Sequence, residues 1–63
     1  MRLTDFWQRM EEQFGAQAQP FAHDQVLGEL GGRTVEQALA AGEPAKDVWR
    51  AVCVEAGVPT RLR

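Results

Sequence analysis

Four polar residues in the second half of the chain are candidates for contact with a partner: Arg33, Lys46, Asp47 and Arg50. The last three belong to a predicted helix over 44–56 and lie away from its apolar stripe. Lys46 and Arg50 could meet nucleic-acid phosphates, whereas the carboxylate of Asp47 would repel them. Arg33 stands between a glycine pair and a predicted helix start, where an arginine either packs on a helix C-terminus or anchors a partner. This mixed charge favours a protein surface over a DNA groove.

Three further residues carry reactive groups, and each has a simpler structural interpretation. His23 and Asp24 are adjacent, so on a helix they point in different directions, and no nucleophile stands at a useful spacing. Cys53 lies on the apolar stripe, where a thiol behaves as a small hydrophobic group. One cysteine and one histidine supply neither a disulfide nor a structural zinc set. We therefore expect no enzyme activity, no cofactor and no metal.

Trp7 and Trp49 each fall within an apolar helical stripe. Aromatic side chains at this spacing usually pack in a core. A platform on which nucleic-acid bases stack is the alternative interpretation. We expect core packing for both, because few other large side chains are present to fill the interior.

Length and charge restrict the classes of function. The 63 residues make one domain, 1–63, of a size that buries only about 60% of the surface exposed by the unfolded chain. Seven basic and nine acidic residues give a net charge of −2, which argues against strong general attraction to nucleic acid or anionic lipid. No apolar run has the length of a membrane span, and an acid interrupts the first segment where a signal peptide needs apolar residues. We expect a complete cytoplasmic protein that does not enter the membrane.

The clearest element is the helix over 44–56. Pro44 suits a first helical position and Gly57 suits the left-handed residue after the end, with Val58 folding back on Cys53. The apolar residues recur at helical spacing and form a single face. They are Ala45, Val48, Trp49, Val52, Cys53 and Ala56.

A first helix is predicted over 4–14, with Thr4 as its N-cap and Gly15 at its end. Its apolar stripe comprises Leu3, Trp7, Met10 and Phe14, widened by Phe6. A second helix is predicted over 20–30, opened by Pro20, weakened by Gly28 and stopped by the glycine pair that follows. Its apolar residues are Phe21, Val26, Leu27 and Leu30.

A third, short helix over 34–41 begins with a capping box in which Thr34 and Gln37 satisfy each other's backbone donors. Val35, Ala38 and Leu39 are expected to face inward. No strand is predicted, and the tail over 59–63 is expected to be flexible. The fold class is therefore all-α, a small orthogonal bundle of three main helices plus one short helix.

The pair of helices in the second half resembles a helix-turn-helix. Ala38, Gly42 and Val48 have the spacing of the small, turn and branched residues that let two such helices cross closely. Glu43 disagrees, because this motif usually has an apolar residue after the turn glycine. Any two helices joined by a tight turn share these anchors, so packing alone also explains them.

Three segments together resemble a known family: MRLTDFWQRMEEQFG, VLGELGGRTVEQALAAG and KDVWRAVC. The chain is similar over nearly its whole length to short actinobacterial proteins catalogued as a domain of unknown function. The resemblance brings no catalytic signature. It implies genes often encoded near the recombinase A locus, and hence a link to DNA repair.

These observations predict a small non-enzymatic interaction module that binds a cytoplasmic protein partner. The alternative is a helix-turn-helix protein that reads DNA with the helix 44–56. The low density of basic residues on that helix favours the first function. The partner and the oligomeric state are left open by the sequence.

Overall fold

The computed structural model describes residues 1–58. Four α-helices form most of this part of the chain: α1 (Leu3–Phe14), α2 (Ala18–Asp24), α3 (Val35–Ala40) and α4 (Ala45–Ala56). Between them lie two 3₁₀ turns, η1 (Gly15–Gln17) and η2 (Gly28–Leu30), and two short strands, β1 (Val26–Leu27) and β2 (Arg33–Thr34). The prediction of a mainly helical protein is confirmed, and the prediction that it has no strand is wrong. The tail predicted to be flexible, 59–63, lies outside the described residues.

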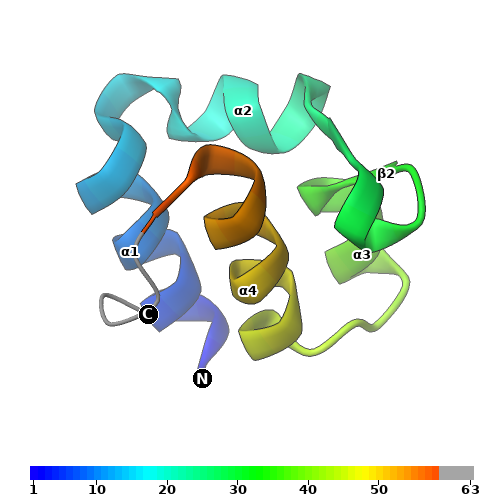
Figure 1. The fold of residues 1–63 in the computed structure, drawn as a ribbon. Coiled ribbons are helices and arrows are strands. Elements are labelled where there is room, and N and C mark those ends of the chain that lie inside the picture. The colour runs from blue at the N-terminus through cyan, green and yellow to red at the C-terminus, as the bar shows by residue number, and fades with distance from the viewer. Residues whose placement is uncertain (59–63) are drawn as a thin grey trace.

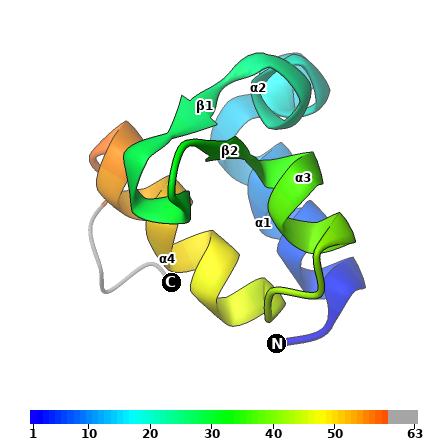
Figure 2. The ribbon, with the colours of Figure 1, turned by 90° about the vertical axis from the view of Figure 1, so that its right-hand side faces the viewer.

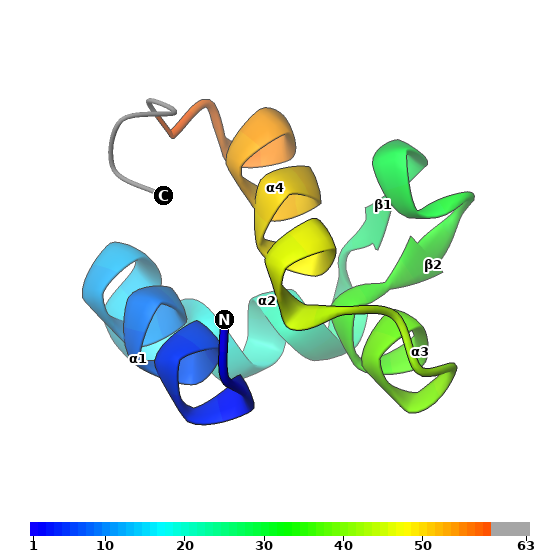
Figure 3. The ribbon, with the colours of Figure 1, turned by 90° about the horizontal axis from the view of Figure 1, so that it is seen from below.

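Helix α4 occupies the middle of the molecule (Figure 1). It lies between α1 on one side and α3 with β2 on the other, while α2 crosses one end. The view from below shows the same order and places the N-terminus close to the start of α4 (Figure 3). Because α4 has neighbours on several sides, it has the largest share of the buried side chains.

The prediction for α4 is confirmed at both ends to within one residue. Pro44 is the N-cap rather than the first helical residue. Gly57 is left-handed at φ 72° and ψ 25°, and the N–H of Val58 donates to the carbonyl oxygen of Cys53 at 2.9 Å. Ala51 is buried although its position is out of phase with the stripe, because η2 and β1 pack on that side of α4. Ala56, predicted to face inward, is exposed.

Helix α1 starts earlier than predicted. Its N-cap is Arg2, whose carbonyl oxygen accepts from the N–H of Phe6 at 3.0 Å, so Thr4 lies inside the first turn and does not cap it. Phe6 and Met10 are its buried residues, whereas Leu3 is 53% exposed. The inward face is therefore centred on Phe6 rather than on the predicted stripe. Gly15 ends the helix with φ 57°, as predicted.

The predicted helix over 20–30 is confirmed over 20–24 and wrong beyond Asp24. Helix α2 begins at Ala18, so Pro20 is inside it, and it ends at Asp24 because Gln25 is extended at φ −82° and ψ 118°. Strand β1 then pairs antiparallel with β2, with Val26 opposite Thr34 and Leu27 opposite Arg33 (Figure 2).

The reversal between β1 and β2 depends on the glycine pair. Gly31 and Gly32 have φ values of 69° and 82°, a region that side chains other than glycine rarely adopt. Their N–H groups donate to the carbonyl oxygens of Gly28 at 3.0 Å and Leu27 at 3.1 Å. The strand alternation turns Leu27 into the core and leaves Val26 exposed. The glycines thus form a hairpin turn where we had predicted only a helix stop.

The capping box of α3 is confirmed. The Thr34 hydroxyl accepts from the N–H of Gln37 at 3.1 Å, and the Gln37 side-chain oxygen accepts from the N–H of Thr34 at 2.9 Å. Val35 and Ala38 are buried, as predicted. The helix ends at Ala40, one residue before the predicted boundary.

Aromatic contacts connect α1 to its neighbours. Phe6 meets Trp49 of α4 edge to face, with ring centroids 6.1 Å apart, and Phe14 stacks on Phe21 of α2 at 4.5 Å. Two small residues of α2, Ala18 and Ala22, are also fully buried. Their small size lets α2 approach the rest of the core closely. The sequence pattern had not singled out either alanine.

Candidate functional site

Three of the four predicted contact residues come together in the structure. Arg33 on β2 and Asp47 and Arg50 on α4 line one hollow of about 460 Å³. Lys46, on the same helix, lies outside this hollow. The remaining lining residues of the hollow come from η2, the turn after it, the turn before α4 and the middle of α4. They are Glu29, Leu30, Gly31, Glu43 and Ala51.

Arg33 is bound on two sides. Its Nε donates to the carbonyl oxygen of Leu30 at 3.0 Å, and its terminal nitrogen donates to the Glu43 carboxylate at 2.9 Å. The side chains of Arg33 and Glu43 are 39% and 38% exposed. One of our two interpretations, an arginine packed on the C-terminal end of a helical turn, is therefore observed. Glu43 departs from the helix-turn-helix pattern, and its ion pair with Arg33 connects the turn before α4 to the β1–β2 hairpin.

Asp47 and Arg50 form the second charged pair of the hollow. The distance from Asp47 Oδ1 to Arg50 Nη1 is 3.7 Å, and both side chains are about half exposed. They are three residues apart on one helix, where opposite charges are neighbours. The hollow thus presents two ion pairs to solvent and little net charge.

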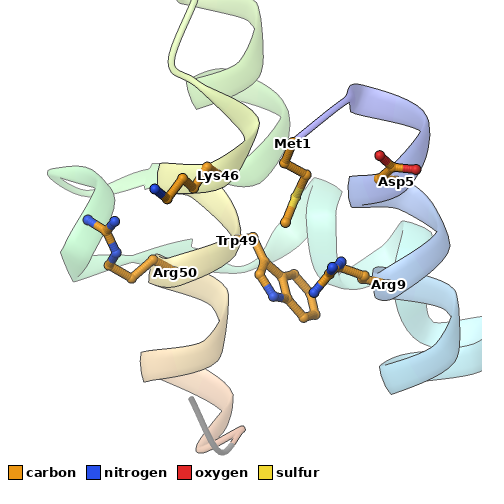
Figure 4. Close-up of a pocket in the computed structure, with 6 residues that line it drawn as sticks. All are labelled: Met1, Asp5, Arg9, Lys46, Trp49 and Arg50. Atoms are coloured by element: carbon orange, nitrogen blue, oxygen red, sulfur yellow. The ribbon is translucent and has the colours of Figure 1, made fainter. Parts of the chain in front are cut away.

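Lys46 lies in a second depression, a groove of about 430 Å³ between α1 and the start of α4. We call this the α1–α4 groove. Figure 4 shows Arg9 and Asp5 on the α1 side, Lys46 and Arg50 on the α4 side, and the indole of Trp49 between them. The residues that line it are Met1, Asp5, Arg9, Lys46, Trp49 and Arg50. Three of the lining side chains are cationic, but the charged ends of Lys46 and Arg50 extend to the side of α4 away from Arg9, and Arg50 is paired with Asp47.

Trp49 forms the floor of the α1–α4 groove but is only 2% exposed. Its edge-to-face contact with Phe6 places it in the core, as predicted. The indole Nε1 is buried and has no hydrogen-bond acceptor among the described residues. A base stacks only on an open aromatic face, so Trp49 offers no stacking platform in this conformation. Trp7 is half-buried and also contacts Phe6 edge to face, at 5.2 Å.

His23 and Asp24 are exposed and lie in the last turn of α2. His23 Nδ1 is 3.1 Å from the carboxylate of Glu36 on α3. This hydrogen bond, then the negative charges of Glu36 and Asp24, raise the pKa of His23 above its ordinary value of 6.5. The contact joins α2 to α3 at the surface. It was not predicted, because it links two helices that are separate in the sequence.

Cys53 is buried within the core, as predicted. Within residues 1–58 there is no group of three histidine, cysteine or acidic side chains with the arrangement of a metal site. No helix in the same range is both long and apolar enough to cross a membrane.

The sequence did not predict the α1–α4 groove. Neither Asp5 nor Arg9 was a candidate residue, and Lys46 was placed away from the apolar stripe of the helix over 44–56. Only the packing of α1 against α4 brings them together. A sequence signal exists in part, since Lys46 and Arg50 flank Trp49 within one turn and a half, but nothing in it identifies which helix lies opposite.

A family model described as "Protein of unknown function (DUF3046)" matches residues 1–61. The chain therefore belongs to this family, which confirms the resemblance to a domain of unknown function. No match was found among curated proteins or among solved structures.

Proposed function

We propose that this member of the DUF3046 family is a small non-enzymatic interaction module that binds a cytoplasmic protein partner. The observation that carries the proposal is the pairing of charge in the hollow between α4 and the β1–β2 hairpin. Arg33 pairs with Glu43, and Arg50 pairs with Asp47. A surface of alternating, neutralised charges suits a protein partner, whose rim is also polar and mixed in charge. A nucleic acid instead selects a surface with an excess of cations.

A helix-turn-helix that reads DNA is the second candidate, and the α3–α4 connection favours it. The capping box fixes the start of α3, and residues 41–44 form a tight turn with Gly42 at φ 90°. Lys46 and Arg50 are exposed on α4. We rank this function lower because Asp47 lies between them and pairs with Arg50.

The first partners to test follow from the family resemblance. If the family is actinobacterial and encoded near the recombinase A locus, proteins of DNA strand exchange are the first class to screen. A protein partner from this class would connect the module to DNA repair without requiring that the module itself bind DNA.

The test begins with the intact chain used as bait in the native cytoplasm, with bound proteins identified by mass spectrometry. Each captured protein is then purified and its affinity measured directly. The charge-reversing substitution Asp47→Lys should weaken the binding of the captured protein at least fivefold, roughly 1 kcal/mol. Gln19→Lys, an exposed position on α2, serves as the control and should leave the affinity unchanged.

Duplex DNA is titrated in parallel at several salt concentrations. The proposal is wrong if duplex DNA binds with micromolar affinity that falls steeply as salt rises, and if Lys46→Ala and Arg50→Ala each weaken that binding. That outcome would establish the helix-turn-helix function instead.

A further inference from the structure

We infer that the α1–α4 groove receives one apolar side chain of the partner, a methionine or a leucine, which takes the place of Met1. The inference rests on the proposed function and specifies the chemistry of the partner. It is carried by the side chain that now extends into the groove, by the charge of the groove, and by the position of Met1 outside the hydrogen-bonded part of α1.

Met1 extends into the groove in the structure. Its side chain runs between α1 and α4 toward the indole of Trp49, and both residues line the groove (Figure 4). Met1 is 45% exposed, whereas Trp49 below it is 2% exposed. A thioether is polarisable and suits an aromatic neighbour. The chain itself therefore shows which chemistry fits this place, a long apolar side chain, and the volume of about 430 Å³ has room for one or two of them.

The charges around the groove do not select a charged occupant. The charged ends of Lys46 and Arg50 extend to the side of α4 away from Trp49, so only the parts of these side chains next to the backbone border the groove (Figure 4). On the opposite wall, Asp5 and Arg9 have charges of opposite sign. A charged side chain is attracted by one of them and repelled by the other. An apolar side chain instead gains free energy from contact with the indole.

Met1 can leave the groove without breaking α1. The backbone hydrogen bonds of the helix begin at Arg2, whose carbonyl oxygen accepts from the N–H of Phe6 at 3.0 Å. Met1 precedes this bond and is not part of the buried core cluster. An incoming apolar side chain restores the contact that Met1 gives up, so the exchange leaves Trp49 covered. Tryptophan is enriched at the energetic centres of protein interfaces, where the surrounding groups exclude water.

The first test uses the full chain with ¹³C-labelled methionine methyl groups and NMR. The chain has two methionines, and Met10, which is fully buried, is the reference for a core position. We expect nuclear Overhauser contacts from the Met1 methyl group to the indole protons of Trp49. If the Met1 methyl group shows none while Met10 shows its contacts within the core, Met1 does not occupy the groove and the inference is overturned.

The second test supplies the apolar side chain as a small molecule. N-acetylmethionine amide is titrated into the ¹⁵N-labelled full chain and into a chain that begins at Arg2, released from an N-terminal fusion. We expect saturable shifts of the Trp49 indole N–H, with at least about threefold tighter binding to the chain without Met1, because the tethered side chain no longer competes for the groove. N-acetylglutamine amide, which is similar in length but polar, should bind at least about fivefold more weakly than the methionine compound.

Leu3→Ala is the matched control for the loss of Met1. It also removes an exposed apolar side chain near the start of α1, but Leu3 does not line the groove and Met1 stays in place. This variant should bind N-acetylmethionine amide with the affinity of the full wild-type chain. Well-dispersed spectra establish that both altered chains are folded. Equal affinities of the wild type and the chain that begins at Arg2, or an equal gain in affinity for Leu3→Ala, would overturn the inference.

Other results of the titration would overturn it as well. Shifts at the exposed Val54 as large as those at Trp49 would show unspecific apolar binding. Indole shifts that depend on protein concentration without the probe would identify a second copy as the occupant.

The proposed function is judged separately, with a purified protein partner. When this partner binds, the Met1 methyl group should lose its Overhauser contacts to the Trp49 ring. A partner that binds and leaves these contacts intact would refute the groove assignment while the interaction module stands. If N-acetylmethionine amide binds as expected and no protein partner exists, the proposed function fails alone.

Discussion

Helix α4 and the segment 25–34 supply side chains to the same core, but their backbones are held in different ways. In α4 the hydrogen bonds are local, and even its end is closed by the bond from Val58 to Cys53. In the segment 25–34, β1 pairs with β2 across the Gly31–Gly32 turn, so the strand bonds join residues farther apart than one helical turn. Arg33 extends these links from the hairpin to Glu43. The helix can therefore form its backbone contacts alone, whereas the segment needs its partners in place first.

This difference changes how the candidate residues are to be tested. Arg33 is part of the framework that holds the segment 25–34, so its substitution would alter both stability and binding. Lys46 makes no ion pair within the described chain and lies on a helix with its own support. Variants of Lys46 therefore report on binding with less disturbance of the fold.

The largest expected effect lies in α4. Trp49→Ala should lower the free energy of unfolding by about 3 to 5 kcal/mol, because a large buried ring is lost from a small core. Urea unfolding followed by circular dichroism measures this change. Val54→Ala on the same helix, where Val54 is 59% exposed, should stay within about 0.5 kcal/mol. A Trp49→Ala chain whose free energy of unfolding stays within about 0.5 kcal/mol of the wild type would mean that the core does not depend on the Trp49 ring.

The next effect tests the segment 25–34. Leu27→Ala should cost about 2 to 5 kcal/mol, because Leu27 is fully buried. Its neighbour Val26 is 55% exposed, so Val26→Ala should cost well under half as much. Equal, small effects of the two substitutions would show that β1 is not docked on the core. Thermal unfolding of both variants provides the measurement.

The capping box offers an intermediate effect. Thr34→Ala should destabilise the protein by about 1 kcal/mol, because the Gln37 N–H loses its acceptor at the start of α3. Thr4→Ala is the matched control, since Thr4 makes no cap hydrogen bond in α1. Its loss should be close to zero, because alanine is the better helix former. A larger cost for Thr4→Ala than for Thr34→Ala would reverse the assignment of the two caps.

A smaller effect is expected for the ion pair that connects the two regions. In a double-mutant cycle of Arg33→Ala and Glu43→Ala, the coupling free energy should be about 0.2 to 1 kcal/mol, since both side chains are partly exposed. The coupling should decrease when salt is raised from about 0.05 M to about 1 M. A coupling that is zero at low salt would mean that the bond to Leu30 alone holds Arg33.

The smallest effect is the pH dependence at His23. Because the folded-state pKa is raised, protonation favours the folded state, and this contribution is complete below the unfolded-state pKa of about 6.5 and is lost as the pH rises through the folded-state value. NMR titration of the His23 ring should give a higher pKa in the wild type than in Glu36→Gln. Identical titration curves would show that the contact with Glu36 does not form in solution.

The regular elements could be predicted because their signals are local. Helix α4, the Gly57 end and the Thr34 capping box each depend on residues within a few positions of one another. Residues 25–30 were predicted to continue the second helix because Val26, Leu27 and Leu30 also fit a helical stripe, while pairing of β1 with β2 has no local signature in so short a hairpin. The inward face of α1 was misplaced for a related reason: which residues are buried depends on the position of α4.

The candidate site divides in the same way. Arg33, Asp47 and Arg50 could be selected by residue type and position, and the structure places them around one hollow. The ion pair between Arg33 and Glu43 was not predicted, because the approach of the hairpin to the turn before α4 is a tertiary contact. The α1–α4 groove was missed altogether, since it exists only where two helices distant in sequence are packed together.

Lys46 is the sole lysine of the sequence, and it stands at the edge of the α1–α4 groove. Amine-reactive reagents will therefore modify a single side chain of the protein, apart from the amino terminus. Coupling to a solid support through amines would cover the groove and remove its ammonium charge, so an affinity resin should be prepared by another chemistry. An environment-sensitive dye attached at Lys46 would, for the same reason, give an optical signal from the groove itself.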